Sequence, residues 1–219
     1  MIDSSVKNFY KSKDSEYAKR YHLEHSPRLD FMIDHFDLGQ IKNKRVIDFG
    51  CGAGDIFAKL NKDNEFIGFE GADLDSKLVP FQQLQVDLDD GIYYNEQSHN
   101  WPLADIGFCC EVVEHLQSPY KACLAMKSYL CQNSTMYFSV PEQRMTHNTP
   151  IPGLIYPIEN FVVFLEQMAW IVEEKVLFDG DWPSWILKCR NAPMDGQKML
   201  FPKNERKFWG NPPHIWTNL

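Results

Sequence analysis

The segment from Arg45 to Leu60 is the part of the sequence that most constrains the fold. A short apolar run, Arg45 to Phe49, predicts a buried strand. A glycine-rich turn follows at Gly50 to Gly54, and Asp55 to Leu60 has the pattern of a helix start. A strand that passes through such a turn directly into a helix predicts a sheet whose strands are joined by helices.

The rest of the chain repeats this alternation of strand and helix. Further strands are predicted at 66–69, 84–86, 106–110 and 136–140, and a final antiparallel pair at 171–178 and 185–189. Helices are predicted around three apolar stripes: Leu29, Ile33 and Phe36; Cys123, Met126 and Leu130; and Phe161, Phe164, Leu165 and Met168. Ser26-Pro27 and Ser118-Pro119 are the expected cap and first-turn residues of the first two helices. We therefore expect an α/β fold with a doubly wound, mostly parallel seven-stranded sheet and an antiparallel final strand.

Length, charge and cysteine usage set the broad class. The chain has 219 residues with ordinary globular composition, so we expect one domain over 1–190 and a C-terminal arm over 191–219 packed on it. The net charge of -8 makes nucleic acid an unfavourable partner. Six cysteines without C-x-x-C spacing indicate reduced thiols. With no leader pattern and no apolar run near the roughly 20 residues that span a bilayer, we expect a cytoplasmic protein without a membrane partner.

Acidic residues follow three of the predicted strands where the apolar run stops. They are Glu70, Asp87 and Glu111. In a doubly wound sheet, ligands bind outside the carboxyl ends of the strands, near the switch in strand order. Carboxylates there accept hydrogen bonds from ribose hydroxyls or an adenine amino group, and a glycine turn lets a ligand approach the backbone. An adenosine with a positive tail fits these groups well.

Four ordered motifs resemble those of class I S-adenosylmethionine-dependent methyltransferases. The motifs are Asp48 to Gly54, Gly68 to Glu70, Val86 to Leu88 and Cys110 to Leu116. The last resembles the fourth-strand signature of the small-molecule branch, and the whole resemblance runs from about Tyr17 to about Cys189. It implies an enzyme that moves a methyl group from S-adenosylmethionine to a small-molecule, sugar or carrier-linked acceptor by in-line displacement, leaving S-adenosylhomocysteine.

The resemblance also implies roles for residues. Asp48 would lie near the amino group of the methionine part, and Glu70 would hold the ribose hydroxyls. Asp87 would accept from the adenine amino group beside the Leu88 backbone. The complete expected cofactor set is Asp48, Gly50, Cys51, Gly52, Gly54, Glu70, Gly71, Asp87, Leu88, Cys110 and Glu111, the last two on the sulfonium side. Helices within about 1–40 would form a lid over the pocket.

Three other functions fit part of the pattern. A nicotinamide-dependent oxidoreductase would need a third glycine where Asp55 stands. A non-catalytic S-adenosylmethionine-binding module or partner subunit would share the fold, but the intact set of cofactor residues favours an enzyme. A metal-assisted RNA 2'-O-methyltransferase would use Glu111, Glu114, His115 and His147 as ligands of a divalent cation. The net negative charge of the chain disfavours RNA binding, and no bound metal is expected.

The acceptor side of the site has weaker signals. The motifs identify no catalytic residue. His147 and His115 are the candidates, although a local structural hydrogen bond is favoured for His115. The loop from Pro141 to Pro157 follows the fifth strand and is expected to select the acceptor through Arg144, His147 and Tyr156. Two aromatic groups have open roles: Tyr10, Tyr17, Tyr21, His22 and His25 fit a lid or simple packing, and Trp182, Trp185, Trp209 and Trp216 fit packing better than an acceptor pocket.

Overall fold

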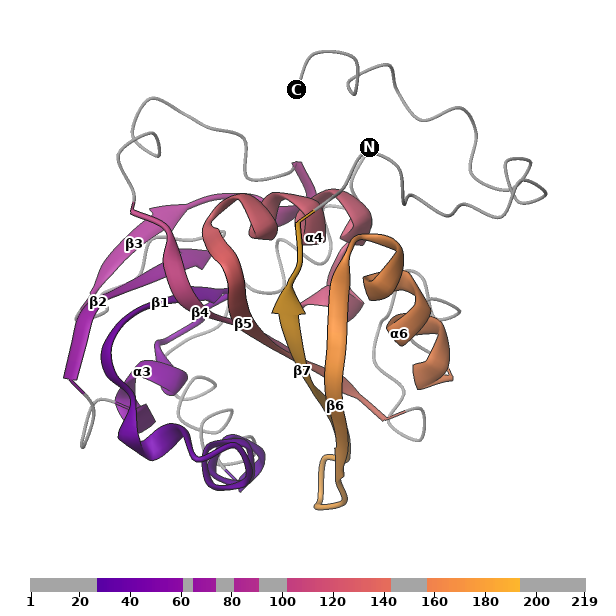
Figure 1. Cartoon of the computed structure of the whole chain (residues 1–219). Coiled ribbons are helices and arrows are strands. Elements are labelled where there is room, and N and C mark those ends of the chain that lie inside the picture. The colour runs from indigo at the N-terminus through magenta and orange to yellow at the C-terminus, as the bar shows by residue number, and fades with distance from the viewer. Residues whose placement is uncertain (1–26, 61–64, 74–80, 91–101, 143–156, 194–219) are drawn as a thin grey trace, which may run out of the picture.

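A seven-stranded sheet forms the centre of the protein. The computed structural model describes residues 27–60, 65–73, 81–90, 102–142 and 157–193 (Figure 1). The strands are β1 Lys42–Phe49, β2 Glu65–Asp73, β3 Gln82–Gln85, β4 Ala104–Cys110, β5 Leu130–Pro141, β6 Trp170–Phe178 and β7 Ser184–Asn191. The α-helices are residues 27–35, α3 Asp55–Leu60, α4 Pro119–Ser128 and α6 Ile158–Gln167. Short 3-10 helices are η1 Leu38–Gln40, η2 Leu88–Asp90 and η4 Val113–His115.

The sheet has the order β3-β2-β1-β4-β5-β7-β6. β1 pairs in parallel with β2 and β4, β2 with β3, and β4 with β5, whereas β7 lies antiparallel between β5 and β6. This confirms the predicted doubly wound sheet and its antiparallel final strand. The chain proceeds from β1 to β3 towards one edge and from β4 to β5 towards the other. The strand order therefore switches between β1 and β4, which is where such sheets bind ligands.

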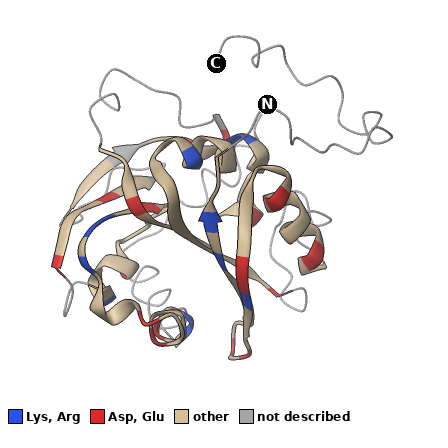
Figure 2. Cartoon of the chain, viewed as in Figure 1, with Lys and Arg blue, Asp and Glu red and all other residues tan. Residues whose placement is uncertain are grey.

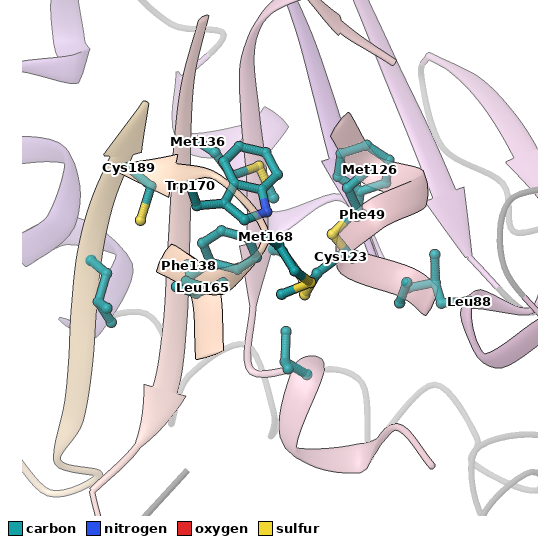
Figure 3. Close-up of a cluster of buried hydrophobic side chains, with 14 of the residues drawn as sticks. Phe49, Leu88, Cys123, Met126, Met136, Phe138, Leu165, Met168, Trp170 and Cys189 are labelled. Atoms are coloured by element: carbon teal, nitrogen blue, oxygen red, sulfur yellow. The ribbon is translucent and has the colours of Figure 1, made fainter. Parts of the chain in front are cut away.

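One face of the sheet packs under α4 and α6. Phe49, Phe138 and Trp170 are fully buried there, and the rings of Phe138 and Trp170 meet edge to face at 5.5 Å. Figure 3 shows Cys123 and Met126 of α4 on the same side of the sheet as these rings. Because apolar burial is the main favourable term in folding, this layer fixes where β4 and β5 lie relative to β1.

The opposite face is covered by the helix at 27–35 and by α3. Leu29 and Met32 of that helix pack in a cluster with Val46 of β1 and Phe108 of β4. At the end of the same helix, His35 Nε2 lies 2.7 Å from Glu174 Oε1 on β6. The helix therefore spans the middle of the sheet from the β1 and β4 strands to β6.

All seven strands are longer than the sequence predicts, and β2 and β5 differ most. β2 continues past Phe69 to Asp73 because its backbone keeps pairing with β1, with Gly71 opposite Asp48 and Ala72 opposite Phe49. β5 begins at Leu130 rather than at Met136. Glycine, alanine and polar residues carry no apolar signal, so the end of an apolar run did not mark the end of backbone pairing.

The expected cap of α4 is wrong in its chemistry. Pro119 stands in the first turn as predicted, but the Ser118 side chain at the N-cap makes no capping hydrogen bond. Instead, Asp89 Oδ1 accepts from the backbone N–H groups of Gln117 at 2.7 Å and Ser118 at 2.8 Å. A carboxylate from the segment after β3 thus stabilises the positive end of α4.

Several expectations lie outside the described residues. They concern the lid before residue 27 with Ser26, the loop residues Arg144, His147 and Tyr156, and the arm from residue 194 onward with Trp209 and Trp216. Within the part that is described, no helix is long and apolar enough to cross a membrane. All six cysteines lie in that part and are reduced thiols. Figure 2 shows acidic and basic residues interspersed over the ribbon.

Candidate cofactor site

The glycine turn after β1 has a backbone that only glycine adopts readily. Gly50, Gly52 and Gly54 have φ values of 77°, 52° and 86°, all in the left-handed region. The Gly50 N–H donates to Ala72 O of β2 at 2.6 Å. The Gly54 N–H donates to Cys51 O at 2.8 Å and closes the turn. The turn is therefore a fixed platform at the carboxyl ends of β1 and β2.

The space around Gly50, Gly71 and Gly52 differs: the first two are packed against neighbouring side chains, and the third is not. A Cβ at Gly50 would lie 2.3 Å from Val112, so the turn after β1 touches the segment after β4. A Cβ at Gly71 would lie 2.7 Å from Cys51 Sγ, so Gly71 makes room for the Cys51 side chain. At Gly52 the nearest atom to such a Cβ is Gly50 O, at 4.0 Å. The turn is thus open to a ligand at Gly52.

Glu111 marks the end of β4 and is held from three sides. It has a left-handed φ of 55°, and its N–H donates to Ser139 O at 2.9 Å. Ser139 Oγ donates to Glu111 Oε1 at 3.0 Å. Arg28 Nη1 lies 3.4 Å from Glu111 Oε2, and both side chains are buried. A non-glycine residue in this conformation costs about 1–2 kcal/mol, and such strain is concentrated at functional sites.

Arg28 lies beside Glu111 at this edge of the sheet, and the sequence did not single it out. It lies one turn before Met32, whose Sδ is 4.0 Å from Cys110 Sγ. Its only sequence signal is an arginine in the first turn of a predicted amphipathic helix, where a charged side chain is ordinarily solvated. The structure instead buries it against the end of β4, so this helix supplies a cation to the switch point.

Asp48 and Cys110 lie together on the face that carries the helix at 27–35. Asp48 is buried and pairs across the sheet with Phe108. Burial raises the pKa of the Cys110 thiol to about 12, and the nearby Asp48 carboxylate adds to this rise. Cys110 is therefore a neutral thiol with the Asp48 side chain nearby.

Glu114 and His115 follow in η4. Glu114 is fully buried, and its two carboxyl oxygens have no hydrogen-bond partner among the described residues. Burial raises the Glu114 pKa well above its usual range, and the negative charge of Glu111 raises it further. His115 Nε2 lies 3.6 Å from Glu114 Oε1. This distance is too long for a hydrogen bond, so the local and catalytic roles expected of His115, like the role expected of His147, stay predictions.

The structure does not bring Glu70 to the turn. Glu70 sits inside β2 opposite Ile47, three residues before Gly50, which is about 10 Å along a strand. Its Oε1 accepts a hydrogen bond from Arg45 Nη1. Burial raises the Glu70 pKa, and Arg45 opposes this rise. The acidic residue at the actual end of β2 is Asp73.

The segment after β3 lies beside the N-terminus of α4. Asp87 Oδ1 accepts from the Asp89 N–H at 3.0 Å, and Leu88 is buried in the cluster under α4. Asp89 ties this segment to the residues that follow η4. Asp87 and Leu88 thus belong to a segment that connects the end of β3 with the N-terminus of α4.

The described residues therefore form one cofactor-type site at the switch between β1 and β4. At this switch the structure brings together Asp48, the turn from Gly50 to Gly54, Cys110 and Glu111, with Arg28 against Glu111, whereas Glu70 lies further back along β2. No group of three or more His, Cys, Asp or Glu side chains in the described ranges could hold a metal ion. An α/β sheet with a glycine turn and carboxylates at this switch defines a protein that binds a nucleoside-type cofactor.

A family model assigns the chain more narrowly. The model described as a methyltransferase domain matches residues 17–190, so the chain belongs to this methyltransferase family. The resemblance to class I S-adenosylmethionine-dependent methyltransferases is thereby confirmed, and with it the expected cofactor. No curated protein matches the sequence.

Solved structures agree with this fold at low sequence identity. A methyltransferase from Aquifex aeolicus is 14% identical and has a TM-score of 0.58, covering 83% of this chain and 100% of its own. The N-methyltransferase NodS from Bradyrhizobium japonicum, in complex with S-adenosylhomocysteine, is 14% identical with a TM-score of 0.52, covering 84% of this chain and 91% of its own. A Haloferax volcanii complex between the Trm112 methyltransferase activator and a methyltransferase is 12% identical and has a TM-score of 0.57, covering 80% of this chain and 96% of its own.

Proposed function

We propose that this protein transfers a methyl group from S-adenosylmethionine to a small-molecule, sugar or carrier-linked acceptor. The observation that carries the proposal is the left-handed glycine turn, which is open at Gly52 and braced against Val112 at the β1 and β4 switch. The net charge of -8 supports a small acceptor over nucleic acid. The reduced thiols support the expected cytoplasmic location.

The residues around the turn suit the methionine part of the cofactor. Asp48 is a buried acceptor for its amino group, and Arg28 is a buried cation for its carboxylate. Cys110 and Glu111 line the sulfonium side. Asp87 and the Leu88 backbone suit the adenine. When bound, the cofactor supplies an activated methyl group.

The ribose acceptor is reassigned within this proposal. Glu70 was the expected residue, but its carboxylate is engaged by Arg45 below the rim. Asp73 ends β2 directly after Ala72, whose carbonyl accepts from the Gly50 N–H. A carboxylate at this strand end suits paired ribose hydroxyls. We therefore propose Asp73 as the ribose-binding residue.

The protein's own contribution to methyl transfer is positioning. Holding donor and acceptor atoms about 3–3.5 Å apart in line can supply several kcal/mol of the barrier reduction. The fixed turn and the sheet-anchored Glu111 provide rigid supports for this alignment. A general base is needed only if the acceptor must lose its proton early in the transfer, and no residue is assigned to that role.

Transfer of a labelled methyl group to acceptor panels tests the proposal. Purified protein should label at least one of three panels: small amines and phenols, sugars, or carrier-linked intermediates. Labelling of RNA alone would contradict the acceptor class. The activator-bound Haloferax methyltransferase supports a second candidate, a catalytic subunit that needs a partner. In that case, label would appear only when a cell extract is added to the purified protein.

A further inference from the structure

Glu114 is a buried carboxyl group that the proposed roles leave unused. It is 1% exposed, and neither oxygen accepts a hydrogen bond from the described residues. The titratable and charged groups facing it come from each element packed around it: Arg28 of the helix at 27–35, Cys109 of β4, Glu111 after β4 and His115 in η4. A buried polar group without a partner is costly, so its retention at this site points to a ligand.

The charges near Glu114 balance without it. Arg28 and Glu111 form a buried ion pair at 3.4 Å, which adds no net charge. Cys109 is a thiol whose pKa is raised by burial, so it is neutral. An ionised Glu114 would therefore lack a dedicated cation. Burial accordingly raises its pKa and favours the protonated form in the ligand-free protein.

We propose that Glu114 senses the charge of the cofactor: it releases its proton when the positive sulfonium of S-adenosylmethionine binds and keeps it when the neutral thioether product binds. The inference rests on the proposed function, since it requires the methionine part to lie beside the end of β4. The amino and carboxylate groups of that part cancel, so the sulfonium carries the net positive charge. The proton leaves to the buffer, which keeps charge in balance.

This exchange would favour the cofactor over its product. A carboxylate beside a sulfonium gains an attraction that a thioether does not offer. Because the free protein must give up a proton, affinity for S-adenosylmethionine rises with pH until Glu114 is ionised without ligand. Affinity for S-adenosylhomocysteine does not change through this group. The preference for the cofactor therefore increases with pH.

Isothermal titration in buffers of different ionisation enthalpy measures this proton directly. At neutral pH in phosphate and in Tris, S-adenosylmethionine should release about one proton more than S-adenosylhomocysteine. Glu114→Gln should abolish this difference and reduce the preference for the charged cofactor by roughly tenfold at neutral pH. His115→Asn should keep the difference, because it leaves the Glu114 carboxyl in place.

Glu159→Gln is the matched control, since Glu159 is an exposed residue of α6 that pairs with Lys175. It should behave as the wild type. A proton difference that survives in Glu114→Gln, or one lost in His115→Asn alone, would overturn the inference while leaving the cofactor site intact. If Glu114→Gln does not fold, the wild type decides: a cofactor preference that stays flat with pH overturns the inference. Failure of both ligands to bind the wild type would overturn the proposed function as well.

Discussion

Two arginine–glutamate pairs, one partly exposed and one buried, occupy different levels of the same sheet. Arg45 and Glu70 pair between β1 and β2, three residues below the glycine turn. Arg28 and Glu111 pair at the carboxyl edge, where a helix from outside the sheet meets the end of β4. The first joins neighbouring strands, and the second joins a helix to the switch point.

The difference shows that position, not residue type, separates structural from ligand-binding carboxylates. The Arg45 side chain fits because Gly68 leaves room: a Cβ there would lie 2.3 Å from Arg45 Nη1. Glu111 has instead a strained backbone and a fully buried partner. We expect the Arg45–Glu70 pair to affect stability alone, and the Arg28–Glu111 pair to affect both stability and cofactor affinity.

Removing the arginine of each pair should give the largest difference in the free energy of unfolding. Arg28→Met leaves Glu111 buried without this cation and should lower the free energy of unfolding by about 3–5 kcal/mol. Arg45→Met affects a partly exposed pair and should cost about 1–2 kcal/mol. Urea unfolding followed by tryptophan fluorescence measures both. An equal or larger loss for Arg45→Met would break the comparison.

Glycine substitutions extend the contrast to the backbone. Gly52→Val puts a branched side chain into the open space of the turn and should weaken S-adenosylmethionine binding by roughly tenfold or more, with backbone strain of about 1–2 kcal/mol. Gly68→Ala should reduce stability through Arg45 and leave affinity unchanged. Gly39→Val is the control, because nothing lies within 4 Å of a Cβ at Gly39. Unchanged affinity in a folded Gly52→Val variant would contradict the site.

Neutralising Glu70 and Asp73 of β2 sharpens the assignment of the ribose residue. Asp73→Asn should weaken S-adenosylmethionine binding by about 1–3 kcal/mol, the cost of losing hydrogen bonds to a charged acceptor. Glu70→Gln should change the affinity little, because that carboxylate is bound to Arg45. Titration calorimetry on both variants gives the answer. The reverse order would restore Glu70 as the ribose residue.

The smallest expected effect concerns the cap of α4. Asp89→Ala should lower the free energy of unfolding by about 1 kcal/mol, because two backbone N–H groups lose their acceptor. Ser118→Ala should be neutral within error, since the serine side chain makes no cap bond. Denaturant unfolding checks the pair. A greater loss for Ser118→Ala would restore the cap predicted from the sequence.

Most of the fold was predictable from the sequence, because its signals are local. Apolar runs and helical stripes located all seven strands, and the glycine turn placed the first strand and helix. The strand ends were less certain: Gly71 and Ala72 continue β2 by backbone pairing, which an apolar pattern does not report. This difference of a few residues places Glu70 inside β2, while its role at the ribose stays a prediction.

The site was predictable only where its residues follow one another in the chain. The turn from Gly50 to Gly54 and the run from Cys110 to Glu111 are contiguous motifs that meet through a parallel sheet. Arg28 was missed because its burial depends on a helix crossing to β4, a contact between distant segments. Asp89 was missed for the same reason, since its partners lie 28 and 29 residues away.

Isothermal titration of the wild type with S-adenosylmethionine, S-adenosylhomocysteine and NADH tests the central claim most directly. The account predicts binding of both sulfur compounds at one site per chain, competition between them, and no binding of NADH. Gly52→Val in parallel ties that site to the turn. Binding of NADH with no binding of either sulfur compound would contradict the account.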